Sequence, residues 1–185
     1  MNTDLWRTLE EQALWLLAHG DQGSPRESIQ AMAQELRLWR YLRNGAYTSW
    51  GILMPVRENR GKRALVREVT WDRPRDWKRS MGTVEHLKRR PSNDPSLKIR
   101  DAELRWTELA PFLDWAAGLP PGLSGPIPPR NSVEHLYGLE GFRSFTHLRF
   151  EWAGDGPPAW APTRLRFLRF LKFLGQELKE REILP

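Results

Sequence analysis

The side chains best suited to acid–base or metal chemistry are four histidines: His19, His86, His135 and His147. His135 and His147 lie on two expected strands of one hairpin, and Glu134 or Glu151 would add a carboxylate. Two imidazoles and a carboxylate suit a metal ion or an acid–base pair. However, a shift of one residue in register would put the two histidines on opposite faces, and no His-x-His or His-x-x-x-His spacing is present. We therefore interpret these histidines as exposed or hydrogen-bonded structural residues.

A second candidate for chemistry is Asp101, Glu103 and Arg105, which have the residue types of an acidic pair and a basic residue in metal-dependent nucleases. A lysine is missing from this group, and the spacing is common by chance. The chain has no Gly-x-Ser-x-Gly elbow, no phosphate-binding glycine loop and no dinucleotide fingerprint. It also has no cysteine, which excludes disulfides, thiol catalysis and thiolate metal sites. We assign no catalytic residue, metal or cofactor, and an enzyme is the less favoured class.

The most basic stretch of the chain runs from residue 73 to residue 90, where seven Lys and Arg stand against Asp76 and Glu85. Its candidate binding residues are Arg73, Arg75, Trp77, Lys78, Arg79, Lys88, Arg89 and Arg90. A solvated loop is the ordinary interpretation of such a charge run. The alternative is a loop that contacts phosphates, in which Trp77 would stack on an unpaired base.

A second basic region lies near the C-terminus. Residues 145–152 alternate as a half-buried strand does, and a Gly/Pro corner follows. From Pro162 to Leu178 the apolar residues recur with helical periodicity, opposite a stripe of Arg166, Arg169 and Lys172. We expect this helix to pack on a sheet, with the stripe as a secondary contact. The alternative is docking of the helix on a partner or an anionic membrane.

The elements that would position these residues follow from periodicity and turn signals. Residues 5–18 predict a helix, and Ser24-Pro25-Arg26-Glu27 predicts the start of a second helix that runs to about residue 42. The two would form an antiparallel helical hairpin, whose Trp39 and Tyr41 face either the core or a partner. Strands are predicted at 46–56, 62–71, 97–106, 133–139 and 145–152, with a short helix at 107–118. The predicted fold is α+β, a mainly antiparallel sheet of about five strands covered by the N-terminal helical hairpin and the C-terminal amphipathic helix.

Length and composition set the remaining limits. A chain of 185 residues is most simply one domain, with a Pro/Gly-rich connector at 119–131 as an alternative boundary. Its ten tryptophans are expected to anchor the core or an interface. The acidic N-terminus and the absence of a long apolar run favour a soluble, cytoplasmic protein and make membrane contact unlikely.

The formal charge of +6 and a pI near 10.0 raise the attraction to anionic partners. With no catalytic signature, we expect a non-enzymatic protein-binding module, such as an adaptor, an inhibitor or an immunity-type partner, with a basic Trp/Arg-rich surface. The alternative is a nucleic-acid-binding protein that uses the 73–90 stretch. An enzyme or a membrane-surface protein is less favoured.

Overall fold

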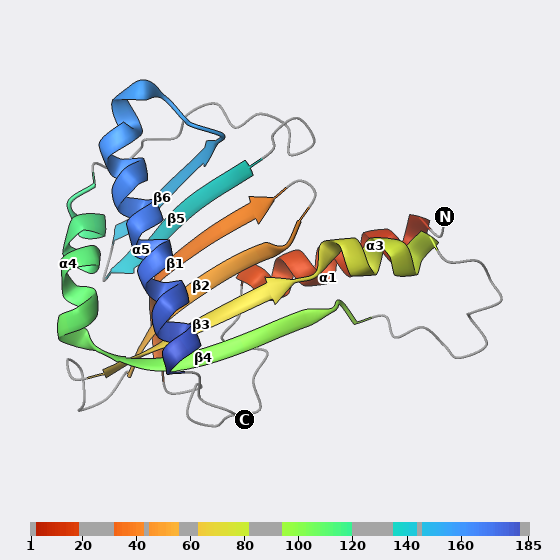
Figure 1. The fold of residues 1–185 in the computed structure, drawn as a ribbon, viewed down its shortest axis with the longest axis horizontal. Coiled ribbons are helices and arrows are strands. Elements are labelled where there is room, and N and C mark those ends of the chain that lie inside the picture. The colour runs from red at the N-terminus through yellow and green to blue at the C-terminus, as the bar shows by residue number, and fades with distance from the viewer. Residues whose placement is uncertain are drawn as a thin grey trace.

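One six-stranded antiparallel sheet organises the molecule (Figure 1). The computed structural model describes residues 3–18, 32–42, 45–55, 63–81, 94–119, 135–143 and 146–181. The strands lie side by side in the order β4-β3-β2-β1-β5-β6. Their bounds are β1 Met32–Leu42, β2 Tyr47–Pro55, β3 Arg63–Trp71, β4 Leu97–Arg105, β5 His135–Arg143 and β6 Thr146–Ala153. The helices are α1 Thr3–Ala18, α3 Arg73–Met81, α4 Trp106–Ala117, the 3₁₀ turn η3 Pro158–Trp160 and α5 Ala161–Glu180. The predicted α+β class and antiparallel sheet are confirmed.

The N-terminal helical hairpin is wrong, because Met32–Leu42 is a strand at the centre of the sheet. Leu36 and Leu38 point to one face while Trp39 and Tyr41 join the core on the other, a period of two that fits a strand buried on both sides. The spacing of three or four residues between apolar positions predicts a helix. In the structure, however, the backbone N–H and C=O groups of this segment pair with β2 on one side and with β5 on the other. The predicted cap at 24–27 lies outside the described residues. The sheet thus has one strand more than predicted.

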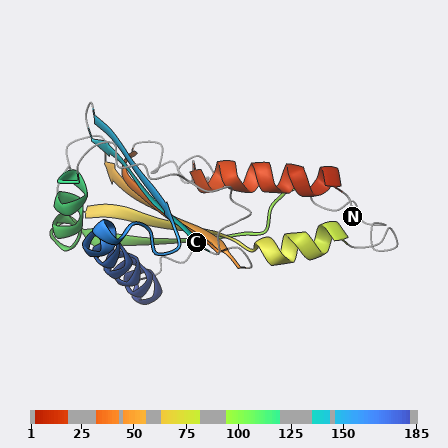
Figure 2. The same cartoon turned by 90° about the horizontal axis from the view of Figure 1, so that it is seen from above.

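The two faces of the sheet carry different helices, as Figure 2 shows. Helices α4 and α5 cover part of one face, which we call the α5 face. Phe167, Phe170 and Leu174 of α5 are fully buried there, so the apolar arc of this helix packs on the sheet as predicted. Helix α1 lies on the opposite face, which we call the α1 face.

The α1 face contains a close approach between two neighbouring strands. Trp39 of β1 lies directly opposite Gly138 of β5 and is 2% exposed. A Cβ placed on Gly138 would lie 1.9 Å from the indole of Trp39. Gly138 is therefore required for this tryptophan to lie flat on the sheet.

Helices α4 and α5 are tied together at their ends. The guanidinium of Arg181 donates to both carboxylate oxygens of Glu108, at 3.1 and 3.2 Å. The hydrogen bond from Arg181 and that from the Arg105 backbone amide lower the pKa of Glu108 to about 2. Glu108 lies in the first turn of α4, where its negative charge also interacts favourably with the positive end of the helix dipole.

The other predicted elements agree closely with the structure. The hairpins at 47–71 and 135–153, the strand at 97–105 and the helices at 106–117 and 161–180 lie within a few residues of their predicted bounds. The Gly/Pro corner before α5 contains Gly154 and Gly156 at φ +55° and +62°, in the left-handed region that favours glycine. The predicted connector from residue 120 to 131 lies outside the described residues.

Candidate functional site

The basic stretch that the sequence singles out begins with a helix, and not with the predicted loop. Arg73–Met81 form α3, which extends beyond the end of the sheet beside α1 (Figure 1). Asp72 precedes it and accepts a hydrogen bond from the Arg75 backbone amide at 3.1 Å, as a helix-capping residue does. Pro74 is tolerated because a first turn does not need its amide hydrogen. Lys88, Arg89 and Arg90 lie outside the described residues.

A buried carboxylate holds α3 in place. Asp76 is fully buried and accepts hydrogen bonds from the indole N–H of Trp71 at 2.7 Å and from Ser96. The Ser96 bonds come from its amide at 2.7 Å and its hydroxyl at 2.6 Å. Arg79 completes the site at 3.2 Å from Asp76. These bonds to an ionised acceptor join α3 to the end of β3 and to the segment that leads into β4.

An aromatic cluster joins α3 to α1 from the other side. Trp6 of α1 stacks on Trp71 at 5.8 Å and receives the edge of Trp77 at 4.8 Å. The guanidinium of Arg73 lies 5.0 Å from the centre of the Trp6 ring and 5.5 Å from that of Tyr47. This cluster fixes the position of α3 without enclosing its outer side.

The predicted binding residues of α3 therefore divide into two groups. Arg73 and Arg79 are half-buried and have partners within the molecule, since Arg79 also donates to the Asp94 carbonyl at 2.6 Å. Arg75, Trp77 and Lys78 are exposed, and Trp77 shows 37% of its surface. Exposed Met81 adds an apolar side chain beside them. We call Arg75, Trp77, Lys78 and Met81 the α3 surface.

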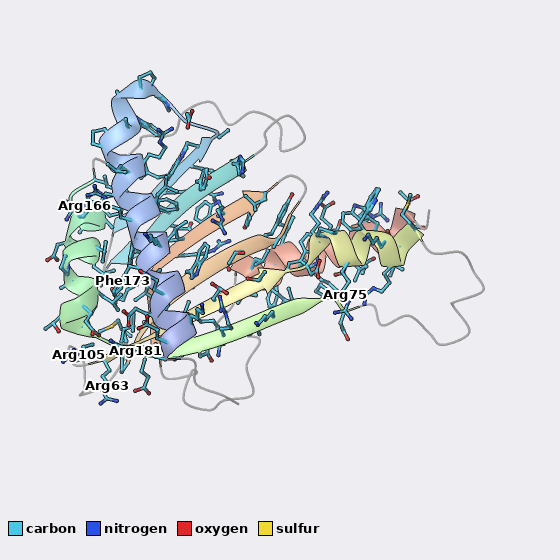
Figure 3. All side chains as sticks on the ribbon, viewed as in Figure 1. Arg63, Arg75, Arg105, Arg166, Phe173 and Arg181 are labelled. Atoms are coloured by element: carbon cyan, nitrogen blue, oxygen red, sulfur yellow. The ribbon has the colours of Figure 1, made fainter. Side chains whose placement is uncertain are left out.

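The second predicted contact lies at the far end of the sheet. Arg166 points to α4, where it donates to the Pro111 carbonyl at 3.2 Å and lies 6.0 Å from the Trp115 ring. Arg169 and Lys172 are exposed on α5. Figure 3 shows Arg166 and Arg75 at opposite ends of the molecule. The structure does not bring the two predicted surfaces together.

The structure does not bring His135 and His147 together. On the hairpin formed by β5 and β6, His147 lies opposite Phe142, and the His135 carbonyl accepts the Gly154 amide. The two histidines are thus seven positions apart along the hairpin, roughly 23 Å at the rise of an extended strand. Within the described ranges, no group of three or more metal-ligating side chains is present.

The nuclease-like group of β4 is engaged in ion pairs. Asp101 binds Arg67 and Glu103 binds Arg63, while Arg105 pairs with Glu108. Each charge is therefore balanced by a neighbour, which favours a structural role over metal binding.

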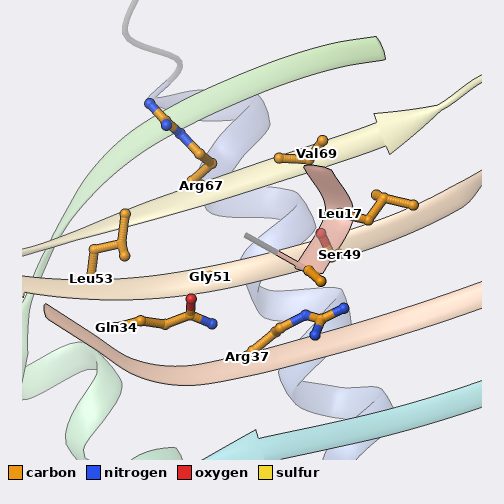
Figure 4. A pocket seen from close by; sticks show the side chains of 9 residues that line it. Leu17, Gln34, Arg37, Ser49, Gly51, Leu53, Arg67 and Val69 are labelled. Carbon is orange, nitrogen blue, oxygen red and sulfur yellow. The ribbon is translucent and has the colours of Figure 1, made fainter. Parts of the chain in front are cut away.

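Sequence reasoning missed a row of charged side chains across the α1 face, which we call the α1-face row. Cross-strand pairing places its members in one line: Asp101, Arg67, Gly51, Arg37, Glu140 and Arg149. Arg67 donates two hydrogen bonds of 2.8 Å to Asp101, while Arg37 lies 3.5 Å from Glu140. Beside Gly51 lies a space of about 10 Å³, enough for one water molecule (Figure 4). Reading 24–42 as a helix hid this row, because its members align only when β1 is a strand.

A larger groove of about 620 Å³ lies beside α1. Glu11, Gln12, Trp15 and Leu16 line it from the helix, facing the segment 94–97. It belongs to the same end of the molecule as α3, and its exposed Trp15 has no counterpart among the predicted site residues.

No protein-family model, curated protein or solved structure matches this chain. Among the described helices, none is both long and apolar enough to cross a membrane.

Proposed function

We propose that this chain is a non-enzymatic protein-binding module and that the α3 surface is its main contact. The supporting observation is that a short helix, held by the buried Asp76, presents an exposed tryptophan and two exposed cations. Trp77 and Arg75 are of the types that dominate binding energy in protein interfaces. The partner is expected to carry an apolar pocket for Trp77 and carboxylates for Arg75 and Lys78.

The rigidity of α3 supports this proposal. The indole of Trp77 rests edge-on against Trp6, so little side-chain freedom is lost when a partner covers it. Met81 lies one turn after Trp77 and Lys78 and extends the apolar contact with an adaptable side chain. A preformed contact of this kind favours a folded partner with a matching surface.

Nucleic-acid binding by the same stretch is the second candidate, favoured by the net charge of +6. Two findings weigh against it. Arg73 and Arg79 have intramolecular partners, so fewer cations remain for phosphates. The edge-on contact with Trp6 also restricts how Trp77 could stack on a base.

The experiment is to immobilise the protein and measure its binding to the products of the neighbouring genes by interferometry. The substitutions Trp77→Ala and Arg75→Glu with Lys78→Glu should each weaken binding by about tenfold or more. The matched control is Arg169→Glu with Lys172→Glu on α5, which makes the same change of charge at the far end and should retain binding.

A gel shift over a salt series tests the second candidate with the same variants. Salt-sensitive binding of nucleic acid that the Arg75/Lys78 variant loses, without any protein partner, would replace the first proposal by the second. Protein binding that survives all substitutions on α3 would refute the proposed contact surface.

A further inference from the structure

A second row of side chains crosses the sheet on the α5 face, and it contains no carboxylate. Cross-strand pairing aligns Lys98, Thr70, Thr48, Arg40, Tyr137 and Trp152. We call this the α5-face row. Helix α5 covers its Trp152 end, where Phe167 contacts the Trp152 and Tyr137 rings, and Figure 1 shows α4 and the rest of α5 over the part of this face that lies away from α3. Tyr137 and Arg40 are half-buried and Lys98 is exposed.

Arg40 lies near the middle of this row without an anionic partner. Among the described residues its guanidinium has no ion pair and no hydrogen bond, and its contact is the Trp50 ring at 5.9 Å. Its Nε is shielded from solvent and unbonded, as is the indole nitrogen of Trp152 in the same row. A partly desolvated charge without a partner is costly, and an acceptor supplied from outside would offset that cost.

Two carboxylates of β3 and its C-terminal end, Glu68 and Asp72, have other partners. Glu68 accepts the Trp50 indole N–H at 2.9 Å and is paired with Arg100. Asp72 caps α3 by accepting the Arg75 amide. In the described part of the chain, neither carboxylate forms an ion pair with Arg40.

The arrangement around Arg40 suits a tetrahedral anion. Arg40 and Lys98 bracket Thr48 and Thr70, whose hydroxyls lie 3.3 Å apart on the two intervening strands. Three strand spacings separate the two cations, about 14 Å between their backbones, and both side chains are long enough to turn inward. Guanidinium, ammonium and hydroxyl groups are the side-chain donors that bind phosphate oxygens.

We propose that the α5-face row is a phosphate-binding site, with Arg40 as its central ligand, Lys98 as a second cation and the Thr48 hydroxyl, which accepts a hydrogen bond from Thr70, as a supporting donor. Tyr137 lies directly opposite Arg40 on β5, and its ring is already stacked with His135 at 6.1 Å and with Trp152 at 5.6 Å, so the site recognises the phosphate group through its polar donors. The ligand chemistry is a phosphate group, and its source can be inorganic phosphate, a free nucleotide or a single strand, which the three probes below distinguish. This site is separate from the α3 surface and does not depend on it.

The test is a calorimetric titration at constant ionic strength with inorganic phosphate, adenosine monophosphate and a short single-stranded oligonucleotide. Arg40→Gln should weaken binding by about tenfold to a hundredfold, the size expected for a hydrogen-bonded charge. Arg169→Gln on the outer side of α5 is the matched control, because it removes one positive charge from an exposed position. Lys98→Gln is a second variant at an exposed site, where loss of folding is not expected.

The outcomes separate the sources and the two proposals. Binding of the monophosphate that only Arg40→Gln and Lys98→Gln weaken supports a site for a free nucleotide, whereas binding of the oligonucleotide alone supports a strand. If the double variant Arg75→Glu with Lys78→Glu binds neither the monophosphate nor the oligonucleotide, the phosphate contact lies on α3 and the proposed site is refuted. Absence of binding by all three probes, or equal binding by Arg40→Gln and Arg169→Gln, would also overturn it.

Discussion

The two rows cross the same six strands on opposite faces, and they handle charge differently. In the α1-face row, each arginine has a carboxylate within 3.5 Å, at Asp101, Glu140 or Glu151. In the α5-face row, Arg40 and Lys98 have none among the described residues. The contrast holds between the two rows and not between the whole faces, because the neighbouring Arg100 on the α5 face is paired with Glu68. The ion pairs of the fold account for the balanced row, whereas the proposed phosphate ligand is our explanation for the cationic row.

The largest effect on stability is expected when one charge of an ion pair in the α1-face row is removed. Arg67→Gln leaves Asp101 buried without its partner, and we expect a loss of roughly 3–5 kcal/mol in the free energy of unfolding, measured by urea denaturation. Arg63→Gln on the same strand and face is the control, since the Arg63 side chain is 72% exposed. Its cost should stay below about 1 kcal/mol. Equal losses of unfolding free energy in the two variants would show that the buried Arg67–Asp101 pair contributes no more than the exposed Arg63–Glu103 pair.

Two glycines of the α1 face give the next largest effect. A methyl group on Gly138 would meet the Trp39 ring, so Gly138→Ala should cost about 1–3 kcal/mol of overpacking. Gly51 in the α1-face row is the control, because a Cβ there meets nothing within 4 Å. Thermal unfolding should show a lower Tm for Gly138→Ala alone. A similar drop for Gly51→Ala would contradict the open space beside Arg37 and Arg67.

A smaller effect on stability is expected from the ion pair between Glu108 of α4 and Arg181 at the end of α5, which lies outside both rows. The folded-state pKa of Glu108, about 2, lies below its ordinary value of 4.5. The ionised form is therefore favoured by folding, and its stabilisation is present above about pH 4.5 and is lost as the pH falls toward 2. Glu108→Gln should lower the Tm at pH 7 and flatten its decline between pH 5 and 2. Parallel curves for the two proteins would exclude this contribution.

The smallest effect is expected at Arg40. Because this guanidinium is partly desolvated and has no ion pair or hydrogen bond in the described chain, Arg40→Gln should leave the free energy of unfolding unchanged or raise it by up to about 0.5 kcal/mol. Urea denaturation of this variant beside Arg67→Gln compares the two rows directly. A loss approaching that of Arg67→Gln would mean that Arg40 stabilises the fold, and the case for a ligand there would fail.

Local signals were sufficient to predict much of this fold. The β2–β3 hairpin, the β5–β6 hairpin and α5 were identified because their apolar periods, turns and corners lie within a few neighbouring residues. Met32–Leu42 was not, since Leu36 and Trp39 fit a helical spacing as well as a strand. What decided its structure was pairing with β2 and with distant β5, which no local pattern contains.

The candidate sites show the same limit. Composition singled out Arg75, Trp77 and Lys78 as candidates, but the contacts of Arg73 and Arg79 with Trp6 and Asp94 depend on the tertiary structure. Both rows were missed, because each takes one residue from each of six strands. They become visible only when β1 is placed and the registers are known.

The central position of β1 also sets the order in which this molecule can fold. Strands β1 to β4 follow one another along the chain and in the sheet, so they can pair as successive neighbours. The backbone of β1 on its other edge can pair only after β5 is available, and Glu140 of β5 is 103 residues from its partner Arg37. Closing so long a loop is slow, and during synthesis the β1 edge stays unpaired until β5 has emerged. Refolding should therefore show early formation of the four-stranded meander, and completion of both rows only when β5 and β6 join it.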